Sequence, residues 1–436
     1  MCISNTQYLV LVMQYIYNAA MDLFKILGDQ NRMFKRDRSL NERAVLGKMQ
    51  TYLKAKETVL VTGIRRCGKS SLLKLLADTH LKGRYFYVNF DDERLSGLRV
   101  EDLQSVYESA LQVLGSEQPR YALLDEVQEI TGWEKWVNRL CEMEGLKIWV
   151  TGSNAQLLSG EMASSLTGRY LPLSLRPFSF AEYLSAVRVK LSYKSTPEKV
   201  RIKASFDDYL RYGGMPEVFK QQSLLLAQEY YANILQRDIA TRLKLRKTNE
   251  LKALSKFCML HTACLHSHNS LAKGFGLKSS HTVQKILASL DAAYLTERSL
   301  LYTRSLKQQA RNPFKLYAVD HAMARSLSTP GAEMDGRLLE TVVFNECRNR
   351  GLEVFYWKAP SAELDIYIPD QKLAIQVSWT LRQTETRTRE LGSLFKAMEY
   401  LKLKQGLILT YDDAKQAIRQ DGKTVHILPV WQWLLG

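Results

Sequence analysis

The chain reads Gly63-Ile64-Arg65-Arg66-Cys67-Gly68-Lys69-Ser70 between a β-rich segment and a helical one. This stretch fits the pattern Gly, any four residues, Gly-Lys-Ser/Thr. Glycines let backbone N–H groups turn toward phosphate oxygens, and the positive end of the following helix adds to the attraction. The stretch therefore predicts a phosphate-binding loop, with Lys69 on the β- and γ-phosphates and the Ser70 hydroxyl on Mg²⁺.

Two acidic residues close a buried strand further along the chain. Tyr121–Leu124 is a short apolar run, and Asp125 and Glu126 follow it directly. Ligands of parallel sheets bind at the carboxyl ends of the strands, so we expect these acids beside the phosphates. Asp125 suits the Mg²⁺ ion, and Glu126 suits the base that orients the attacking water. The loop and the acids together predict ATP or ADP and Mg²⁺ as ligands.

Two further polar residues are candidates for the reaction itself. Asn154 follows the strand Lys147–Thr151 and is expected to hold the lytic water near the γ-phosphate. Arg169, in Thr167-Gly168-Arg169, is a candidate to place its guanidinium on the γ-phosphate, within the chain or from a neighbouring subunit of a homo-oligomer. An ordinary surface arginine is the alternative interpretation of Arg169.

The fold class follows from the alternation of segments over residues 58–150. Strands at Thr58–Thr62 and Arg84–Phe90 are each followed by a helix, at Ser70–Ala77 and Val100–Leu114. Such an alternation predicts a parallel sheet with helices on both faces. We therefore predict an α/β protein with a P-loop ATPase core.

The order of the motifs resembles that of a known family, the bacterial and archaeal AAA-type (AAA+) ATP-binding proteins, which are related to the STAND ATPases. The resemblance covers roughly residues 33 to 410 and is carried, in order, by Gly63–Ser70, Leu124–Gln128 with Trp133-Glu134, Thr151–Asn154, Leu166–Arg169, Pro177–Phe180 and Tyr212–Pro216. It implies that Pro216 packs near the nucleotide. It also implies a winged helix after the lid and a C-terminal domain similar to the PD-(D/E)XK nucleases.

Motifs and resemblance together give a set of candidate residues and parts. The predicted nucleotide contacts are Gly63, Ile64, Arg65, Arg66, Cys67, Gly68, Lys69, Ser70, Ser71 and Pro216. The predicted metal ligands are Ser70 and Asp125, and the predicted catalytic residues are Glu126, Asn154 and Arg169. The predicted parts are an N-terminal extension (1–32, helical or a misassigned start), the ATPase core (33–177), a helical lid (178–249), the winged helix (250–330) and the nuclease-like domain (331–436).

Composition indicates a soluble globular protein. The chain has 436 residues, 46% hydrophobic and 24% charged, enough for several domains. Its six cysteines form no Cys-x-x-Cys pair, which favours reduced thiols and a cytoplasmic location. No stretch reaches about 18 apolar residues, so we expect no membrane span.

The middle of the chain is strongly basic. Residues 181–330 hold 24 Lys and Arg against 11 Asp and Glu, while the whole chain has a net charge of +16. Such a balance is typical of contact with a polyanion, and residues 250–330 are the candidate surface for double-stranded DNA. A solvated basic face that aids solubility is the alternative.

One helix of this region has the pattern of a DNA reader. Ser279 is a good N-cap, and an apolar face follows at helical spacing: Val283, Ile286, Leu287 and Leu290. The opposite face carries Ser280, His281, Gln284 and Lys285, which fit a major groove. A β-ribbon with Arg304, Lys307 and Arg311 is expected to meet the DNA backbone. The alternative is a winged helix that only bridges domains.

The C-terminal domain lacks part of the nuclease pattern that it resembles. By that resemblance, Glu340 matches the helix acid and Asp365 the metal-binding aspartate. The next strand calls for an acid and a lysine where this chain has Gln376 and Ser378. Glutamine brings no charge to Mg²⁺, and serine cannot stabilise the phosphate in the transition state. We therefore predict a degenerate site that does not cut nucleic acid, unless Glu363 or Lys358 replaces the lost groups.

Two other functions remain open at this point. The first is an ATP-regulated DNA nuclease of a defence or mobile-element type, which requires an active C-terminal domain. The second is a STAND-like switch, in which the bound nucleotide controls the binding of protein partners. The motifs name the nucleotide site and leave the target of the ATPase undetermined.

Overall fold

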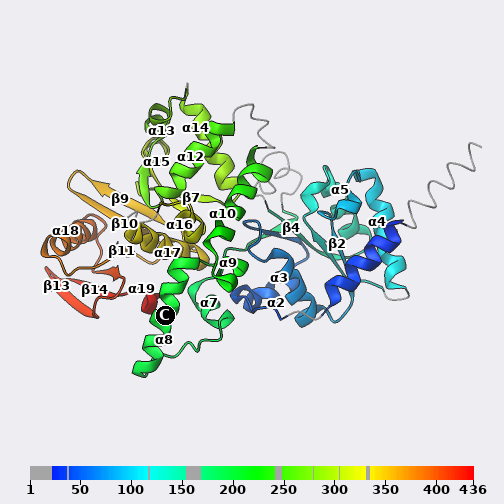
Figure 1. Cartoon of the computed structure of the whole chain (residues 1–436), viewed down its shortest axis with the longest axis horizontal. Coiled ribbons are helices and arrows are strands. Elements are labelled where there is room, and N and C mark those ends of the chain that lie inside the picture. Colours follow the sequence, from blue (N-terminus) through cyan, green and yellow to red (C-terminus); the bar gives the residue numbers. More distant parts are fainter. Residues whose placement is uncertain are drawn as a thin grey trace, which may run out of the picture. The chain divides into compact units, whose positions relative to one another are not determined.

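A computed structural model describes residues 22–36, 39–115, 118–153, 168–240, 248–277, 279–303, 305–329 and 334–436. The chain forms two compact units (Figure 1). The first unit contains the described residues up to Leu175 except Ile64–Cys67. The second unit contains Ile64–Cys67 and Arg176–Gly436.

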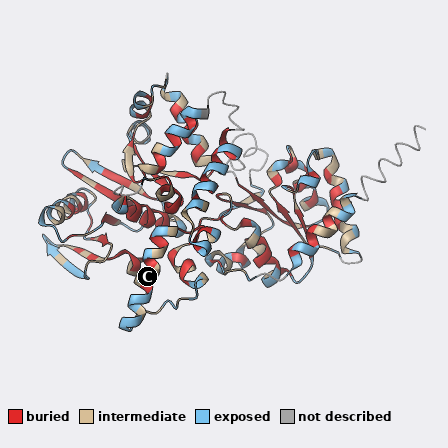
Figure 2. Cartoon of the chain, in the orientation of Figure 1, coloured by how far each residue is buried: buried red, intermediate tan, exposed pale blue. Residues whose placement is uncertain are grey.

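The first unit is built on five parallel strands in the order β2-β3-β4-β1-β5. They are β1 (Thr58–Thr62), β2 (Tyr85–Asn89), β3 (Tyr121–Asp125), β4 (Lys147–Gly152) and β5 (Tyr170–Ser174). Every residue of β1 is buried, as a strand covered on both faces requires (Figure 2). The sheet and its helices confirm the predicted fold class.

Helices cover the two faces of this sheet. α4 (Leu103–Leu114) and α5 (Trp133–Met143) pack on the face that carries Leu60, Ile148 and Val150. Trp149 points to the other face, where Tyr52 of α2 (Met49–Lys54) meets it. The remaining helical segments are residues 22–35, α3 (Lys69–Leu76) and the short turns η1 (Ala44–Lys48), η2 (Ala77–Leu81), η3 (Glu93–Leu95), η4 (Val100–Asp102) and η5 (Val127–Glu129).

Predicted and observed bounds in this unit differ by one to three residues. The predicted helix Ser70–Ala77 is α3, which begins one residue earlier, and the predicted strand Arg84–Phe90 is β2 without its end residues. The predicted helix Val100–Leu114 starts as the turn η4 before α4 begins. Such differences are expected because element ends have incomplete hydrogen bonding.

The second unit begins with helices, as the pattern after residue 178 predicts. They are α7 (Phe180–Ala186), α8 (Thr196–Tyr212), α9 (Pro216–Gln221), α10 (Leu224–Asn233) and η7 (Ile234–Ala240). Sequence sets two of the starts, because Ser179 with Glu182 and Ser195 with Glu198 form capping boxes at α7 and α8.

A nine-stranded sheet in the order β13-β14-β12-β11-β10-β9-β7-β8-β6 forms the rest of the second unit. Its strands are β6 (Cys264–His266), β7 (Thr296–Leu301), β8 (Phe314–Ala318), β9 (Phe355–Ala359), β10 (Ala362–Ile368), β11 (Leu373–Ser378), β12 (Gln405–Thr410), β13 (Gln416–Gln420) and β14 (Lys423–Pro429). Its helices are α12 (Thr248–Leu260), α13 (His268–Gly274), α14 (Ser280–Ala292), α15 (Leu306–Arg311), α16 (His321–Ser326), α17 (Asp335–Asn349), α18 (Thr384–Tyr400) and α19 (Val430–Leu435).

This sheet continues across the predicted boundary between residues 330 and 331. β7 pairs with β9 in parallel, with Leu300 opposite Phe355 and Leu301 opposite Tyr356. β7 and β8 form a β-ribbon, as predicted. Lys307 and Arg311 were expected on its strands, but they lie on the helix α15 that connects them, and Arg304 lies outside the described residues. Two compact units are observed, and the finer division of residues 178–436 stays a prediction.

No helix of the described chain combines the length and the apolar character that a membrane crossing requires.

Candidate nucleotide site

The loop between β1 and α3 has the backbone conformation of a phosphate-binding loop. Gly63 has φ of 154° and Gly68 has φ of 104°, values that side chains disfavour. Gly68 is also the N-cap of α3, so the loop delivers its backbone directly onto a helix N-terminus. Arg66 adopts φ of 69° between the two glycines. The glycines of the motif are therefore required by the turn itself.

Lys69 lies inside the loop that it follows. Its side chain is 3% exposed, and its Nζ donates a hydrogen bond to the carbonyl oxygen of Gly63 at 3.1 Å. The same Nζ lies 3.6 Å from Glu126 Oε1. An ammonium held between the loop backbone and an acid at the end of β3 is placed to meet anionic phosphate oxygens.

Asp125 is fully buried at the carboxyl end of β3. One carboxylate oxygen accepts a hydrogen bond from Tyr87 Oη at 2.8 Å, and the other accepts from Thr151 Oγ1. Ser70 also hydrogen-bonds to this carboxylate. Burial raises the pKa of Asp125 above its ordinary value, against the opposite effect of these hydrogen bonds. A divalent cation beside Asp125 and Ser70 would favour the ionised carboxylate.

Glu126 leaves the strand in a left-handed conformation, with φ of 52°. Its backbone N–H donates to Thr151 Oγ1 at 3.0 Å, and its Oε2 accepts a hydrogen bond from Gln128 Nε2. The hydroxyl of Thr151 therefore connects both acids, because it also donates to Asp125. This arrangement turns the Glu126 side chain toward Lys69 while Asp125 stays in the strand.

The residues around these acids fit a nucleotide with its metal. A cavity of about 400 Å³ in the first unit includes Ser70, Ser71, Tyr87 and Asp125 in its lining. The hydroxyls of Thr62 and Ser153, at the ends of β1 and β4, are buried without a hydrogen-bond partner among the described residues. Buried polar groups nearly always have partners, so such hydroxyls are expected to bind a ligand or water. Lys69, Ser70 and Asp125 supply the charges and oxygens that MgATP requires.

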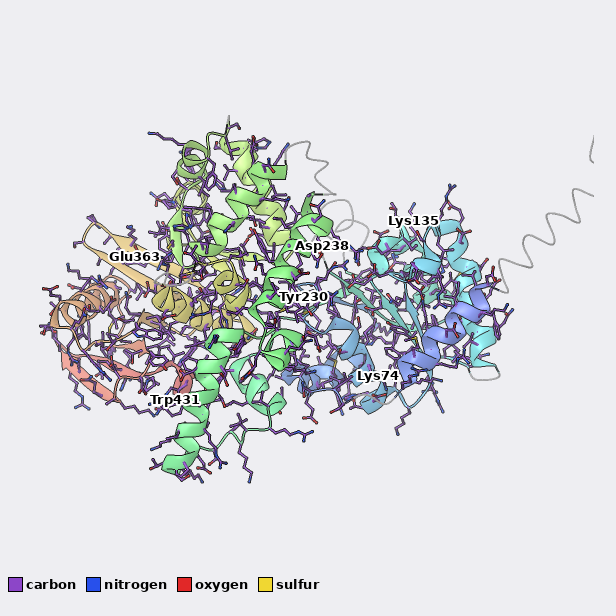
Figure 3. The ribbon with its side chains drawn as sticks, in the orientation of Figure 1. Lys74, Lys135, Tyr230, Asp238, Glu363 and Trp431 are labelled. Atoms are coloured by element: carbon purple, nitrogen blue, oxygen red, sulfur yellow. The ribbon has the colours of Figure 1, made fainter. Side chains whose placement is uncertain are left out.

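Ile64–Cys67 at the tip of the loop belong to the second unit, and two of these residues have contacts within it. Arg65 Nε lies 3.5 Å from Asp238 Oδ2, and the guanidinium of Arg66 lies 4.8 Å from the ring centre of Tyr230. Figure 3 shows Tyr230 and Asp238 on the consecutive helices α10 and η7. The predicted roles of Ile64, Arg65, Arg66 and Cys67 as nucleotide contacts stay predictions.

Two other predicted residues have clear positions, and one lies outside the described residues. Arg169 precedes β5 and accepts from Thr58 N at 3.0 Å through its carbonyl, so it lies at the edge of the sheet opposite the loop. Its guanidinium pairs with Glu142 at 3.1 Å. The five residues of β1 separate the Arg169 backbone from the loop by roughly 16 Å. Contact with a nucleotide in a neighbouring subunit stays a prediction. Asn154 lies outside the described residues.

Pro216 begins α9 in the second unit, after a tight turn. Gly214 N donates to Asp320 Oδ2 at 2.9 Å, and Gly214 O accepts from Phe178 N at 2.8 Å. These contacts explain why Gly213-Gly214 precedes Pro216, since a side chain at 214 would collide with Phe178. The predicted nucleotide contact of Pro216 stays a prediction.

The structure brings together three of the four residues predicted as a degenerate nuclease site. Glu340 of α17 and Asp365 of β10 both bind the ammonium of Lys315, at 3.1 Å and 2.7 Å. Gln376 accepts a hydrogen bond from Asp365 N at 3.4 Å and donates one to Glu390 Oε2 at 2.7 Å. Ser378 Oγ instead donates to the carbonyl oxygen of Thr380. No group of three His, Cys, Asp or Glu residues in the described chain is arranged to hold a metal ion.

Burial opposes charge in this lysine–carboxylate cluster. Burial alone would lower the pKa of Lys315, but the charges of Asp365, Glu340 and Glu363 raise it well above its ordinary value. Burial and the charge of Asp365 raise the pKa of Glu340 to about 8. The ammonium of Lys315 is therefore retained at neutral pH.

Three residues of these sites escape sequence reasoning: Tyr87, Thr151 and Lys315. Tyr87 and Thr151 occupy strands β2 and β4, where the sequence pattern indicates only burial. Lys315 is the one charged residue of β8, whose five residues are all buried. A lysine inside an apolar strand was the available signal, because a buried lysine needs an acidic partner.

Comparison with known proteins agrees with this geometry. Residues 55–184 match a family described as an AAA domain, and residues 203–333 match a domain of unknown function. The uncharacterized protein MJ1544 of Methanocaldococcus jannaschii is 32% identical over 399 residues, 86% of this chain and 88% of that protein. An uncharacterized protein of Haemophilus influenzae is 30% identical, over 76% of this chain and 85% of that protein.

A solved structure with a weaker likeness is the Orc1 protein of Aeropyrum pernix, in complex with DNA. It shares 14% identity, over 67% of this chain and 93% of that one, with a TM-score of 0.29, which is too low to support an argument. The matched AAA domain includes the loop, Asp125 and Glu126. The chain is therefore a nucleotide-binding protein with an AAA domain, and it belongs to the same family as MJ1544 of M. jannaschii.

Proposed function

We propose that this chain is a Mg²⁺-dependent ATPase, with Lys69, Ser70, Asp125 and Glu126 as its centre. The observation that carries the proposal is the buried set of contacts around Asp125 and Lys69 at the carboxyl ends of β1, β3 and β4. Mg²⁺, when bound, neutralises phosphate charge and polarises the γ-phosphate. Side chains of this protein bind the phosphates, hold the metal and accept the proton of the attacking water.

Each side chain has a defined part in the reaction. Lys69 binds phosphate oxygens and stabilises the negative charge that develops in the transition state. Glu126 accepts a proton from the attacking water. Thr151 and Gln128 hold Glu126 in position through hydrogen bonds to its backbone N–H and to its carboxylate. Asp125 and Ser70 hold the metal, with Tyr87 and Thr151 fixing the carboxylate.

Two variants test this proposal. Lys69→Ala should lower the ATPase rate at least about 100-fold, because the charge on the transferred phosphate is lost. Glu126→Gln should keep ATP binding and lose hydrolysis, so that ATP stays bound. ATP turnover is measured together with ATP affinity by isothermal titration calorimetry.

Matched controls are available in the same unit. Lys56→Ala removes a lysine just before β1, at the opposite end of that strand, and Glu101→Gln neutralises an exposed acid in η4. Both should retain the wild-type rate. Normal turnover by Glu126→Gln would refute the role of Glu126, and absence of any ATP or ADP binding by the wild-type chain would refute the proposal as a whole.

A second proposed activity is the binding of double-stranded DNA by residues 250–330, folded as a winged helix. It is supported by α14, in which Val283, Ile286, Leu287 and Leu290 are buried. His281, Gln284 and Lys285 are exposed on the opposite face. A polar cavity of about 210 Å³ lies beside this face, lined by Ser267, His268, Asn269, Ser280, Gln284, Arg311 and Asn312. Hydroxyls, amides and a guanidinium are the groups that contact DNA phosphates.

Paired charge removals test the DNA proposal. Lys285→Ala with Arg311→Ala should weaken DNA binding about tenfold or more. Lys285 lies on the exposed face of α14, and Arg311 lines the polar cavity beside that face. Lys252→Ala with Lys256→Ala removes the same charge from exposed positions of α12 and should have a smaller effect. Equal losses of DNA affinity in the two double variants would indicate non-specific attraction to a basic surface. Fluorescence anisotropy with labelled duplex gives the affinities.

We further propose that the C-terminal part is nuclease-like in fold and inactive in cleavage. Two observations support the proposal. The acids Glu340 and Asp365 are both bound to the ammonium of Lys315. Gln376 and Ser378 bring no charge and bind other groups of the chain. Plasmid cleavage with Mg²⁺ or Mn²⁺ tests it. Cleavage that disappears in Asp365→Ala would favour the active nuclease instead.

A further inference from the structure

Three carboxylates in the second unit converge on a single ammonium group. Lys315 Nζ lies 2.7 Å from Asp365 Oδ1, 3.1 Å from Glu340 Oε1 and 3.1 Å from Glu363 Oε1. The Lys315 side chain is 3% exposed. A lysine ammonium has three N–H donors, so three acceptors at these distances use all of them.

The acids of this cluster are themselves held by other partners. Val377 N donates to Asp365 Oδ2 at 2.9 Å, and Tyr317 Oη donates to Glu340 Oε1 at 2.7 Å. Lys358 Nζ pairs with the second oxygen of Glu363 at 3.2 Å, from the more exposed side. Figure 3 labels Glu363 in this region of the sheet. The carboxylates are thus oriented on one point from several directions.

A buried point shared by three carboxylate oxygens normally requires a cation. A divalent ion such as Mg²⁺ binds oxygens at about 2.0–2.1 Å, whereas an ammonium binds them at hydrogen-bond distance. The observed distances are those of hydrogen bonds, and Lys315 Nζ lies at the common point. A divalent ion at this point would have to displace the ammonium and meet its charge at close range.

The lysine comes from a different part of the sheet from the acids. Lys315 belongs to β8, Glu340 to α17, and Glu363 and Asp365 to β10. In the sheet order, β7 and β9 separate β8 from β10. The ion pairs therefore join β8 to β10, two strands that do not pair with each other through their backbones.

We propose that Lys315 is the resident cation of this cluster: it occupies the position of a metal ion, excludes divalent cations and makes this part of the fold independent of metal. The inference goes beyond the ATPase and does not depend on ATP turnover. It adds a specific reason for the proposed lack of nuclease activity, namely that the chain fills its own cation site.

The first test is the wild-type cluster itself, in the full chain with Asp125→Asn to remove the metal site of the nucleotide loop. Thermal unfolding is recorded in EDTA and in millimolar MnCl₂, and Mn²⁺ binding is followed by electron paramagnetic resonance. The expected result is no Mn²⁺ bound at the cluster and the same Tm in both solutions. If the protein with an intact Lys315 binds Mn²⁺, and if Asp365→Asn abolishes that binding, the proposal is overturned.

The second test removes the ammonium in the same background. Lys315→Met keeps an unbranched side chain one atom shorter than lysine, removes the ammonium, and leaves Glu340, Glu363 and Asp365 facing one another. This variant should be less stable in EDTA, should bind about one Mn²⁺ per chain, and should gain more than about 2 °C in Tm with Mn²⁺. A folded variant without any gain in Mn²⁺ binding would overturn the proposal.

Two further variants keep this test decisive. Lys358→Met removes a lysine 3.2 Å from the same Glu363, but one that is 51% exposed, and it should create no Mn²⁺ site. If Lys315→Met does not fold, it is combined with Glu340→Gln and Asp365→Asn. Removing both charges should restore folding without Mn²⁺, and failure to do so would show that charge balance is not what Lys315 supplies.

Discussion

Tyr87 is a residue whose part in the nucleotide site can be isolated. Its hydroxyl donates to Asp125 Oδ2 at 2.8 Å, and its ring stacks on Phe34 with centres 3.9 Å apart. Tyr87→Phe keeps the stacking and removes a hydrogen bond to a charged group, worth about 1.5–3 kcal/mol. We expect the Mg²⁺ concentration for half-maximal ATP binding to rise about tenfold or more, as measured by calorimetry at fixed ATP.

Tyr85→Phe is the matched control for this prediction. Tyr85 lies on the same strand and packs edge-on against the same Phe34. The hydroxyl that donates to Asp125 is that of Tyr87. The control should leave the Mg²⁺ requirement unchanged. If Tyr87→Phe also leaves it unchanged, Asp125 does not depend on this hydroxyl to hold the metal.

At the level of elements, the turn between α8 and α9 is fixed by close packing. A Cβ at Gly214 would lie 2.3 Å from the carbonyl oxygen and 2.8 Å from the nitrogen of Phe178. These are backbone atoms, which cannot move aside as a flexible side chain can. Gly214→Ala should therefore destabilise the second unit by about 1–3 kcal/mol or more and lower Tm by several degrees in thermal unfolding.

Gly392 provides the comparison for this change. It lies inside α18, and a Cβ there meets nothing within 4 Å. Gly392→Ala should leave Tm unchanged or raise it, since alanine favours a helix by about 1 kcal/mol over glycine. Equal Tm values for the two variants would contradict the packing argument at Gly214.

For some helices and strands, the local sequence pattern was sufficient to predict the element. The strands β1 to β4 of the first unit were predictable because a strand buried on both faces leaves a continuous apolar run in the sequence. The helix α14 of the second unit was predictable from the helical spacing of its apolar residues. The helix α15 inside the predicted ribbon was missed. Its six residues, Leu306–Arg311, are too few to display a helical period. The pairing of β7 with β9 was missed because strand sequences do not name their neighbours.

At the scale of the whole molecule, charge gives the clearest prediction. The net charge is +16, and residues 181–330 contain most of it. If this surface neutralises about six DNA phosphates, affinity should fall about 10³-fold between 50 and 200 mM salt, because bound counterions are released. Anisotropy titrations across this range measure the slope. An affinity that does not change with salt would remove the DNA-binding proposal.

The sequence by itself determined the phosphate-binding loop, the two acids at the end of β3 and the α/β class. These features are local, because a glycine pattern sets the backbone of one turn and parallel strands bring their carboxyl ends to one edge. Tertiary structure alone decided which distant side chains meet. Tyr87 joins Asp125 across 38 residues, and Lys315 joins Asp365 across 50. Such contacts depend on the order of the strands in the sheets, which no periodicity in the sequence encodes.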